Sequence, residues 1–442
     1  MRIRGMILIA AASVAISAQV AWAQPAGPAA APARVDGRTV VAEIRRVLAA
    51  NYVLPEVRPK LDAALARGLA EGRYDVSDPA VLLERVNADL TAVAHDKHLS
   101  LEYDPRASAE AAAPPRGPQE GSAPSPEQIR QAERRNHGFT EMKVLPGNVR
   151  YVNLQGFVWV GPKSAEAYDN AMRFLRDGDA AIIDLRQNGG GSPQAVQYLV
   201  SHFMEPNRPI VTFHMGASQV DRLSTLATLP AGRMVGKPLY VLTSGNSASA
   251  AEEFTGHVAG FRLGELIGAT TAGAGFRNQF FPLTGGYVIS VSVGRAVLAS
   301  TGKDWEGVGI APTTPVDPEK ALDVAQMHAM RRLAATAPAR EKPNYEATAA
   351  MLAAKLDPVA TALPLAAYSG TFGERKVRLE NGRLTFQREG GTKLMMVPIG
   401  PNLVAFENDP TTRIEYKVAG SQATGFELQR GDGSRVAADR TS

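Results

Sequence analysis

The chain of 442 residues contains no cysteine. This absence excludes a disulfide framework, a thiol nucleophile and any thiolate metal site. The seven histidines are not spaced like metal ligands on one helix, because no His-Glu-x-x-His pattern occurs. His95 and His98 are three residues apart, but only Asp96 lies beside them as a further potential ligand. We therefore expect neither a metal ion nor another cofactor.

Long apolar runs and blocks of like charge are also scarce. The chain has 48 basic and 44 acidic residues, and the absence of a basic block argues against a nucleic-acid partner. The only leader-like segment is residues 1–23, in which Arg2 and Arg4 precede an apolar run and Ala21-Trp22-Ala23 is typical of a cleavage site. These features predict a signal peptide, a periplasmic or secreted location, and no membrane-spanning segment after cleavage. An uncleaved N-terminal anchor is the alternative.

Composition and periodicity divide the remaining chain into six parts. Apolar residues recur at helical spacing after Val35, and strand patterns alternate with helical patterns after Asn136. Near the C-terminus, alternating patterns flank the turn signal Asn381-Gly382, which indicates a small β domain that forms a sandwich or a barrel. We expect a tether at residues 24–34, a helical domain at 35–103 and a Pro/Ala-rich linker that buries little surface at 104–135. An α/β domain at 136–335, a connector at 336–362 and the β domain at 363–442 follow.

Ser249 follows a predicted strand, residues 239–243, and a turn of small residues, and it begins a predicted helix. Free N–H groups at the start of that helix, including the amide of Ala250, would face the serine and stabilise negative charge there. The simpler interpretation is that Ser249 is only an N-cap. A Gly-x-Ser-x-Gly elbow, which would argue against this simpler role, is absent.

A glycine triplet ends the neighbouring predicted strand and strengthens the case for Ser249. Gly189, Gly190 and Gly191 follow the apolar run at residues 180–185. The amides of Gly189 and Gly190 would supply a second arm of an oxyanion hole, because glycine has no Cβ to prevent close approach. A phosphate loop is disfavoured, since the Walker pattern and its lysine are missing. Ser249 is therefore our candidate nucleophile.

Residues 184–191, 243–253, 268–273 and 305–312 follow one another along the chain. In this order they resemble the tail-specific (C-terminal processing) peptidase family, in the branch of interphotoreceptor retinoid-binding protein and the tricorn core protease. The resemblance covers roughly residues 52–316. It implies an α/β core like those of crotonase and Clp protease, preceded by helices. It also implies a serine peptidase that hydrolyses peptides or proteins through an acyl-enzyme and needs no cofactor.

The same resemblance suggests which groups assist the serine. The classical branch carries a lysine base 25 residues after the serine, but that position is Ala274 here, so only Lys97 or Lys303 could replace it. The other branch uses a histidine from the end of the helical region, and His98 corresponds to it, with His95 as the rival.

A third group should orient this base. A late glutamate in the same branch corresponds to Glu306, which would hold the histidine in position. Glu252 follows Ser249 by three residues and would lie on the same helical face near the site.

Two other functions remain as alternatives. A non-catalytic protein that binds a retinoid or fatty acid on the same fold would explain the missing lysine. An envelope scaffold would use the C-terminal β domain as its working part. The segment of chain between His98 and the α/β domain is too short to contain a separate peptide-binding module. Strict specificity for the C-terminal tails of substrates is therefore not expected. The oligomeric state is not predicted.

Overall fold

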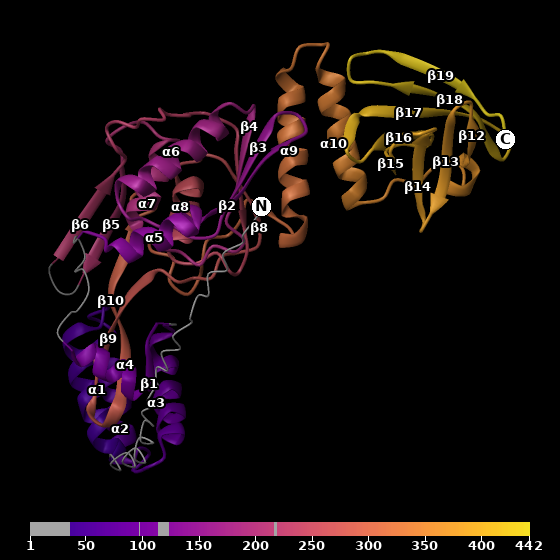
Figure 1. Cartoon of the computed structure of the whole chain (residues 1–442). Helices are drawn as coiled ribbons and strands as arrows, with labels where there is room; N and C mark the ends of the chain where they lie inside the picture. Colours follow the sequence, from indigo (N-terminus) through magenta and orange to yellow (C-terminus); the bar gives the residue numbers. More distant parts are fainter. Residues whose placement is uncertain (1–35, 97, 114–122, 216–218) are drawn as a thin grey trace, which may run out of the picture.

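The computed structural model describes residues 36–96, 98–113, 123–215 and 219–442. The expected signal peptide and tether, at residues 1–34, lie outside this part of the chain. The described chain forms a helical domain, a central α/β domain, a helical hairpin and a C-terminal β-barrel (Figure 1). This arrangement confirms the expected fold class. None of the helices within the described ranges is long and apolar enough to cross a membrane.

Three helices build the N-terminal domain because each of them has one apolar face. They are α1 (Gly37–Asn51), α2 (Arg58–Ala70) and α3 (Pro79–Ala94). The side chains of Asp36 and Asp78 cap α1 and α3 by accepting hydrogen bonds from backbone amides in the first turn. Leucine and valine side chains from the three helices meet in one buried core, as the helical spacing predicted.

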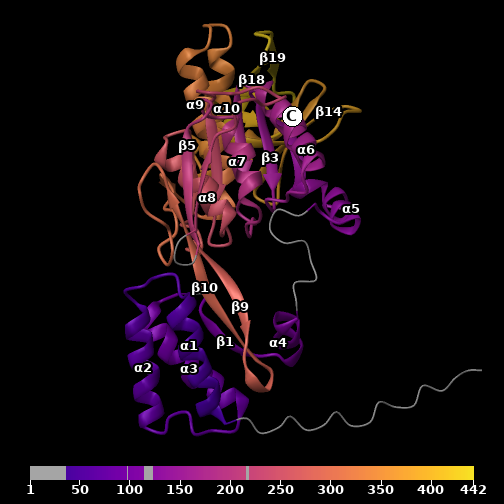
Figure 2. The ribbon, with the colours of Figure 1, turned by 90° about the vertical axis from the view of Figure 1, so that its left-hand side faces the viewer.

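A long hairpin of the central domain completes this core (Figure 2). It consists of β9 (Phe276–Pro282) and β10 (Tyr287–Leu298). The first half of β10 pairs antiparallel with β1 (Ser100–Tyr103), and the second half pairs with β5 (Pro209–Met215). Tyr287, Ile289 and Val291 are buried among the helices. One strand therefore belongs to both domains.

The central sheet has six strands in the order β11-β8-β7-β4-β3-β2. All neighbours are parallel except β2, which is an antiparallel edge strand. The strands are β2 (Phe139–Leu145), β3 (Val149–Leu154), β4 (Ala180–Asp184), β7 (Leu239–Thr243), β8 (Glu265–Gly268) and β11 (Thr314–Pro315). Every residue of β4 and β7 is buried, as expected for parallel strands covered on both faces.

Helices cover both faces of this sheet. One face packs against α6 (Pro162–Arg176), α7 (Pro193–Ser201) and α8 (Ala250–Gly260). The other face packs against α9 (Ala321–Thr336). A separate antiparallel sheet contains β1, β10, β5, β9 and β6 (Gln219–Ser224). The carboxyl ends of β4 and β7 consequently lie next to each other, where ligands bind in α/β sheets.

The segment expected as a linker, residues 104–135, contains two helices within its described part. They are α4 (Pro105–Ala112) and α5 (Pro126–Arg134), and each follows a capping residue and begins with proline. Ser108 of α4 is buried, and its hydroxyl donates to the carbonyl of Leu283 at the hairpin tip. The linker is therefore partly helical because local capping signals outweigh its Pro/Ala-rich composition, but α4 buries only Ser108 and α5 only Ala132, so its described part buries little surface, as expected.

The C-terminal part begins with α10 (Lys342–Leu356), which pairs with α9 and separates it from the barrel (Figure 1). The barrel is an antiparallel meander. Its strands are β12 (Gly370–Phe372), β13 (Arg375–Glu380), β14 (Arg383–Arg388), β15 (Leu394–Pro398), β16 (Leu403–Phe406), β17 (Asp409–Ala419), β18 (Gln422–Gln429) and β19 (Arg435–Asp439).

Two features define this barrel. Thr371 of β12 exchanges backbone hydrogen bonds with Thr441 and Ser442, so the residues that follow the last strand meet the first strand. Asn381 and Gly382 both have positive φ, which confirms the predicted two-residue hairpin turn.

Candidate active site

Ser249 lies between β7 and α8, where the apolar run and the small-residue turn predicted it. Its backbone has φ +54° and ψ −115°, a conformation that is strained for any residue other than glycine. Its amide donates a hydrogen bond to Oε2 of Glu252 (2.9 Å), and its carbonyl accepts from the amides of Glu252 and Glu253. These contacts hold the strained turn in place. Strain of this kind is concentrated at functional sites.

Glu252 connects the serine turn to the loop after β8. Its side chain is fully buried and accepts four hydrogen bonds. Besides the amide of Ser249, the donors are the Thr271 hydroxyl (2.6 Å) and the amides of Gly273 (2.6 Å) and Ala274 (2.7 Å). Ala274, at the loop position that carries a lysine in the classical branch, therefore binds Glu252 through its backbone amide.

Gly190 lies directly against the serine. A Cβ at this position would be 2.8 Å from Cβ of Ser249 and 3.2 Å from the amide nitrogen of Ala250, and the φ of Gly190 is +109°. Only glycine fits such a contact. The structure therefore brings the glycine triplet and the serine turn together, as the sequence predicted.

The amides around Ser249 are not equally available. The Gly190 amide donates to Oδ1 of Asn188 (2.8 Å), so this amide is already engaged, which differs from its expected place in an oxyanion hole. Asn188 is fully buried, and its Nδ2 donates to the carbonyl of Leu154. The amides of Gly189 and Ala250 make no hydrogen bond with any residue that the structure describes. These two groups are the available donors near the serine.

His98 lies between α3 and β1, next to the root of the hairpin. Its Nδ1 is 3.7 Å from Oε1 of Glu306 and 3.8 Å from Oδ1 of Asp96. Its amide donates to Asp96 (2.8 Å), and its carbonyl accepts from the Ser290 hydroxyl of β10 (2.6 Å). The backbone of His98 is therefore held on one side by Asp96, at the end of the helical domain, and on the other by β10 of the shared hairpin.

The electrostatic surroundings of His98 favour its protonated form. The contact with Glu306 raises the pKa of His98 above its ordinary value of 6.5, against the opposing effect of burial, and Asp96 and Glu252 add to the increase. Within the described residues no hydrogen bond joins His98 to Ser249. Glu252 interacts electrostatically with His98 and also accepts a hydrogen bond from the Ser249 amide. This carboxylate is therefore common to the surroundings of the histidine and of the serine.

Glu306 follows Trp305 in a turn of the chain. Its side chain is almost buried, with 7% of it exposed. Its Oε2 accepts hydrogen bonds from the amides of Gly275 (2.7 Å) and Phe276 (2.8 Å), and its Oε1 is directed at His98. Burial opposes ionisation of this carboxyl. The contact with His98 and the two amides outweigh burial and lower the pKa of Glu306. The carboxylate is thus ionised and held in a fixed orientation.

Asp96 is a site residue that the sequence analysis considered only as a potential metal ligand. Its side chain is 1% exposed, and it provides a second carboxylate beside His98. Burial and the charge of Asp96 together raise the pKa of the Tyr52 hydroxyl. Ligand atoms of Asp96, His98 and Glu306 lie within 4.8 Å of one another. The same arrangement stabilises an imidazolium without a metal ion.

The other candidate bases lie in different surroundings. His95 is exposed and ends α3 in a left-handed conformation, with φ +52°. Lys303 is exposed, and Lys97 lies outside the described residues. Among the described candidates, the histidine whose ring contacts the two carboxylates is His98.

Comparisons with known proteins agree with this architecture. Residues 148–316 match the model described as peptidase family S41, and residues 33–137 match the N-terminal domain of peptidase S41 in eukaryotic IRBP. The carboxy-terminal processing protease CtpB of Bacillus subtilis (strain 168) is 27% identical over 179 residues, which are 40% of this chain and 36% of that protein. The chain thus spans about a third of the length of this relative.

Two solved structures are similar at low identity. The photosystem II D1 C-terminal processing protease has a TM-score of 0.43 at 17% identity, over 64% of this chain and 94% of that chain. The tricorn protease has a TM-score of 0.39 at 12% identity, over 65% of this chain and 35% of that chain. The two family models together cover more than half of the residues, in agreement with the expected class of serine-type peptidase. The chain belongs to peptidase family S41.

Proposed function

We propose that this protein is an exported serine peptidase that hydrolyses peptide bonds through an acyl-enzyme on Ser249. His98 is the general base, and Glu306 orients it. The observation that carries this proposal is the approach of His98 Nδ1 to the ionised, almost buried Glu306 at 3.7 Å, since a carboxylate on one ring nitrogen is what a histidine base requires.

In the first half of the reaction, Oγ of Ser249 attacks the carbonyl carbon of the substrate. Nε2 of His98 accepts the hydroxyl proton, and Glu306 stabilises the imidazolium through Nδ1. The carbonyl oxygen becomes an oxyanion, which the amides of Ala250 and Gly189 stabilise together with the positive end of α8. The bond from carbon to nitrogen then breaks, and the leaving amine takes the proton from His98.

In the second half, water attacks the acyl-enzyme. His98 accepts a proton from this water and returns it to Oγ of Ser249 as the acid product leaves. The substrates are peptides or proteins. The periplasmic or secreted location rests on the leader pattern of residues 1–23.

Active-site labelling tests the proposal. The purified mature protein should react with a fluorophosphonate probe at Ser249, and mass spectrometry of the labelled peptide would identify the position. Ser249→Ala should abolish labelling and lower peptidase activity by roughly 10⁴-fold or more. His98→Ala should lower both, whereas His95→Ala, in the exposed rival position, should retain both.

Two outcomes would contradict this function. Full cleavage by the Ser249→Ala variant would exclude the serine as nucleophile. Absence of labelling combined with saturable binding of a fatty acid or retinoid would favour the ligand-binding alternative.

A further inference from the structure

A basic pocket of about 270 Å³ lies where α10 begins beside the barrel. None of the residues of the candidate active site lines it. Its charged lining consists of four arginines and one aspartate: Arg340, Arg413, Arg430, Arg435 and Asp432. Pro343 and Asn344, in the first turn of α10, and the β18–β19 turn complete the wall.

Hydrogen bonds hold the elements around this pocket together. Nη1 of Arg413 donates to the carbonyl of Pro343 (3.0 Å), which ties β17 to α10. Nδ2 of Asn344 donates to the carbonyl of Gly431 (2.9 Å), which ties α10 to the β18–β19 turn. The pocket is therefore formed before any ligand arrives, which lowers the entropic cost of binding.

The positive charge of the lining is only partly compensated. Arg435 pairs with Glu427 (3.0 Å), and Arg430 lies in the electrostatic surroundings of Asp432. Arg413 bonds to a carbonyl, and Arg340 makes no hydrogen bond or ion pair with any residue that the structure describes. Neither Arg340 nor Arg413 therefore forms an ion pair with a residue that the structure describes, although the charge of Glu346 acts on Arg413.

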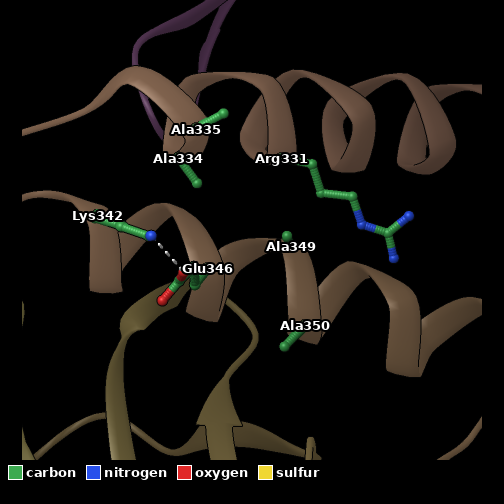
Figure 3. Close-up of a pocket in the computed structure, with 7 residues that line it drawn as sticks. All are labelled: Arg331, Ala334, Ala335, Lys342, Glu346, Ala349 and Ala350. Carbon is green, nitrogen blue, oxygen red and sulfur yellow. Dashed lines mark ion pairs between the residues drawn. The ribbon is translucent and has the colours of Figure 1, made fainter.

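Glu346 is a further acid whose charge acts on Arg413, and it is itself paired. Lys342 pairs with Glu346 (3.8 Å) in the neighbouring groove between α9 and α10, and Figure 3 shows this pair directed toward each other. Burial and the charge of Arg435 lower the pKa of Arg413, so the cation at residue 413 is held at an energetic cost. A bound anion would remove part of this cost.

The start of α10 adds a favourable field. This helix has 15 residues, and the positive end of its dipole is at the pocket, where two residues of its first turn are part of the wall. The first-turn amides of Lys342 and Asn344 already donate to the carbonyls of Pro338 and Glu341, so the arginine side chains are the groups here that would bind phosphate directly.

We propose that this pocket binds a phosphate group, either of a soluble phosphate compound or of a lipid headgroup. A phosphate dianion matches the two unpaired guanidinium groups in charge, and its oxygens match the planar fork of arginine. The volume is near the lower end for small-ligand sites, which suits a phosphate better than a large ligand. This site is independent of the proposed peptidase reaction.

Calorimetric titration of the full mature protein with inorganic phosphate at constant ionic strength tests the proposal. We expect saturable binding to the wild type, and binding about tenfold weaker in Arg340→Gln and in Arg413→Gln. Arg388→Gln is the matched control, because this arginine of β14 pairs with Glu374 outside the pocket and should bind like the wild type. Arg340 is exposed, so its variant keeps the test valid even if Arg413→Gln destabilises the barrel.

Cosedimentation with vesicles separates the two sources of phosphate. If the ligand is a headgroup, phosphatidylcholine vesicles that contain phosphatidic acid, whose phosphomonoester can carry two negative charges, should retain the wild type, and Arg340→Gln should lose this retention. If the ligand is soluble, phosphate should bind in the calorimeter without vesicle retention. Absence of both kinds of binding, or equal losses in Arg388→Gln and Arg340→Gln, would overturn the proposal.

Discussion

The imidazole of His98 and the carboxylate of Glu306 approach to 3.7 Å, although the two residues belong to different domains. The histidine follows the helical domain, and the glutamate follows the shared strand β10. The helical domain is therefore part of the candidate site. Its position relative to the α/β domain decides whether His98 meets its carboxylate.

Replacement of Glu306 should change the pH dependence of peptide hydrolysis. The general base must be neutral, and the pKa of His98 is raised by Glu306, so the acidic limb of kcat/KM in the wild type should lie above pH 6.5. Glu306→Gln removes the largest cause of this increase, so the limb should move to lower pH. The maximal rate should fall by about 10²–10⁴-fold, because the ring loses its orientation. Asp96→Asn should shift the limb less, and an unchanged limb in Glu306→Gln would contradict the assigned role.

Two adjacent glycines provide a matched pair of variants. Gly190→Ala places a Cβ 2.8 Å from Cβ of Ser249 at a φ of +109°, so activity and stability should both decrease. Gly189→Ala meets no atom within 4 Å and retains its backbone amide, so it should keep most of the activity. Peptidase rates and melting temperatures of both variants check this expectation. Equal losses in the two variants would mean that the contact with Ser249 is not decisive.

The buried carboxylate of Glu252 should be essential for stability. Glu252→Gln places an amide donor against a group of four hydrogen-bond donors, which should lower the free energy of unfolding by about 2–4 kcal/mol. Urea denaturation measures this change. Glu110→Gln is the control, because Glu110 is exposed on α4, and its replacement should cost less than about 0.5 kcal/mol. A similar stability of both variants would contradict the structural role of Glu252.

Ser290 and Ser292 of β10 distinguish a positioning effect from a general effect on the strand. The Ser290 hydroxyl binds the carbonyl of His98, so Ser290→Ala should lower kcat more than it changes KM. The buried Ser292 hydroxyl has no hydrogen-bond partner within the described residues, so Ser292→Ala should leave both constants nearly unchanged. Steady-state kinetics of the two variants give this comparison, and a larger loss in Ser292→Ala would exclude the positioning role.

Local patterns predicted the elements that carry the serine. The strand at residues 239–243 has the predicted bounds, because a continuous apolar run defines a buried parallel strand. The turn at Ser249 and the glycine triplet follow from small residues at strand ends. These features depend on neighbours in the sequence, which is why periodicity and turn chemistry are sufficient to find them.

Long-range partners could not be obtained in this way. The alternating pattern that begins at Tyr287 predicts a strand, but it does not tell which core will contain Ile289, and the structure assigns it to the helical domain. Asp96 gave no local signal of its function, since its importance comes from a histidine ring that contacts a distant carboxylate. Helix α4 was missed because a Pro/Ala-rich composition concealed its capping residue, Asp104.

The strand shared by the two domains has a consequence for the order in which the protein matures. Helices α1 to α3 are synthesised first, but their core lacks Tyr287, Ile289 and Val291 until β10 has been made. Glu306 follows only a few residues later. A growing chain therefore contains neither a finished helical domain nor an oriented base, and under the proposed mechanism the capacity to cut peptides arises in one late step of synthesis.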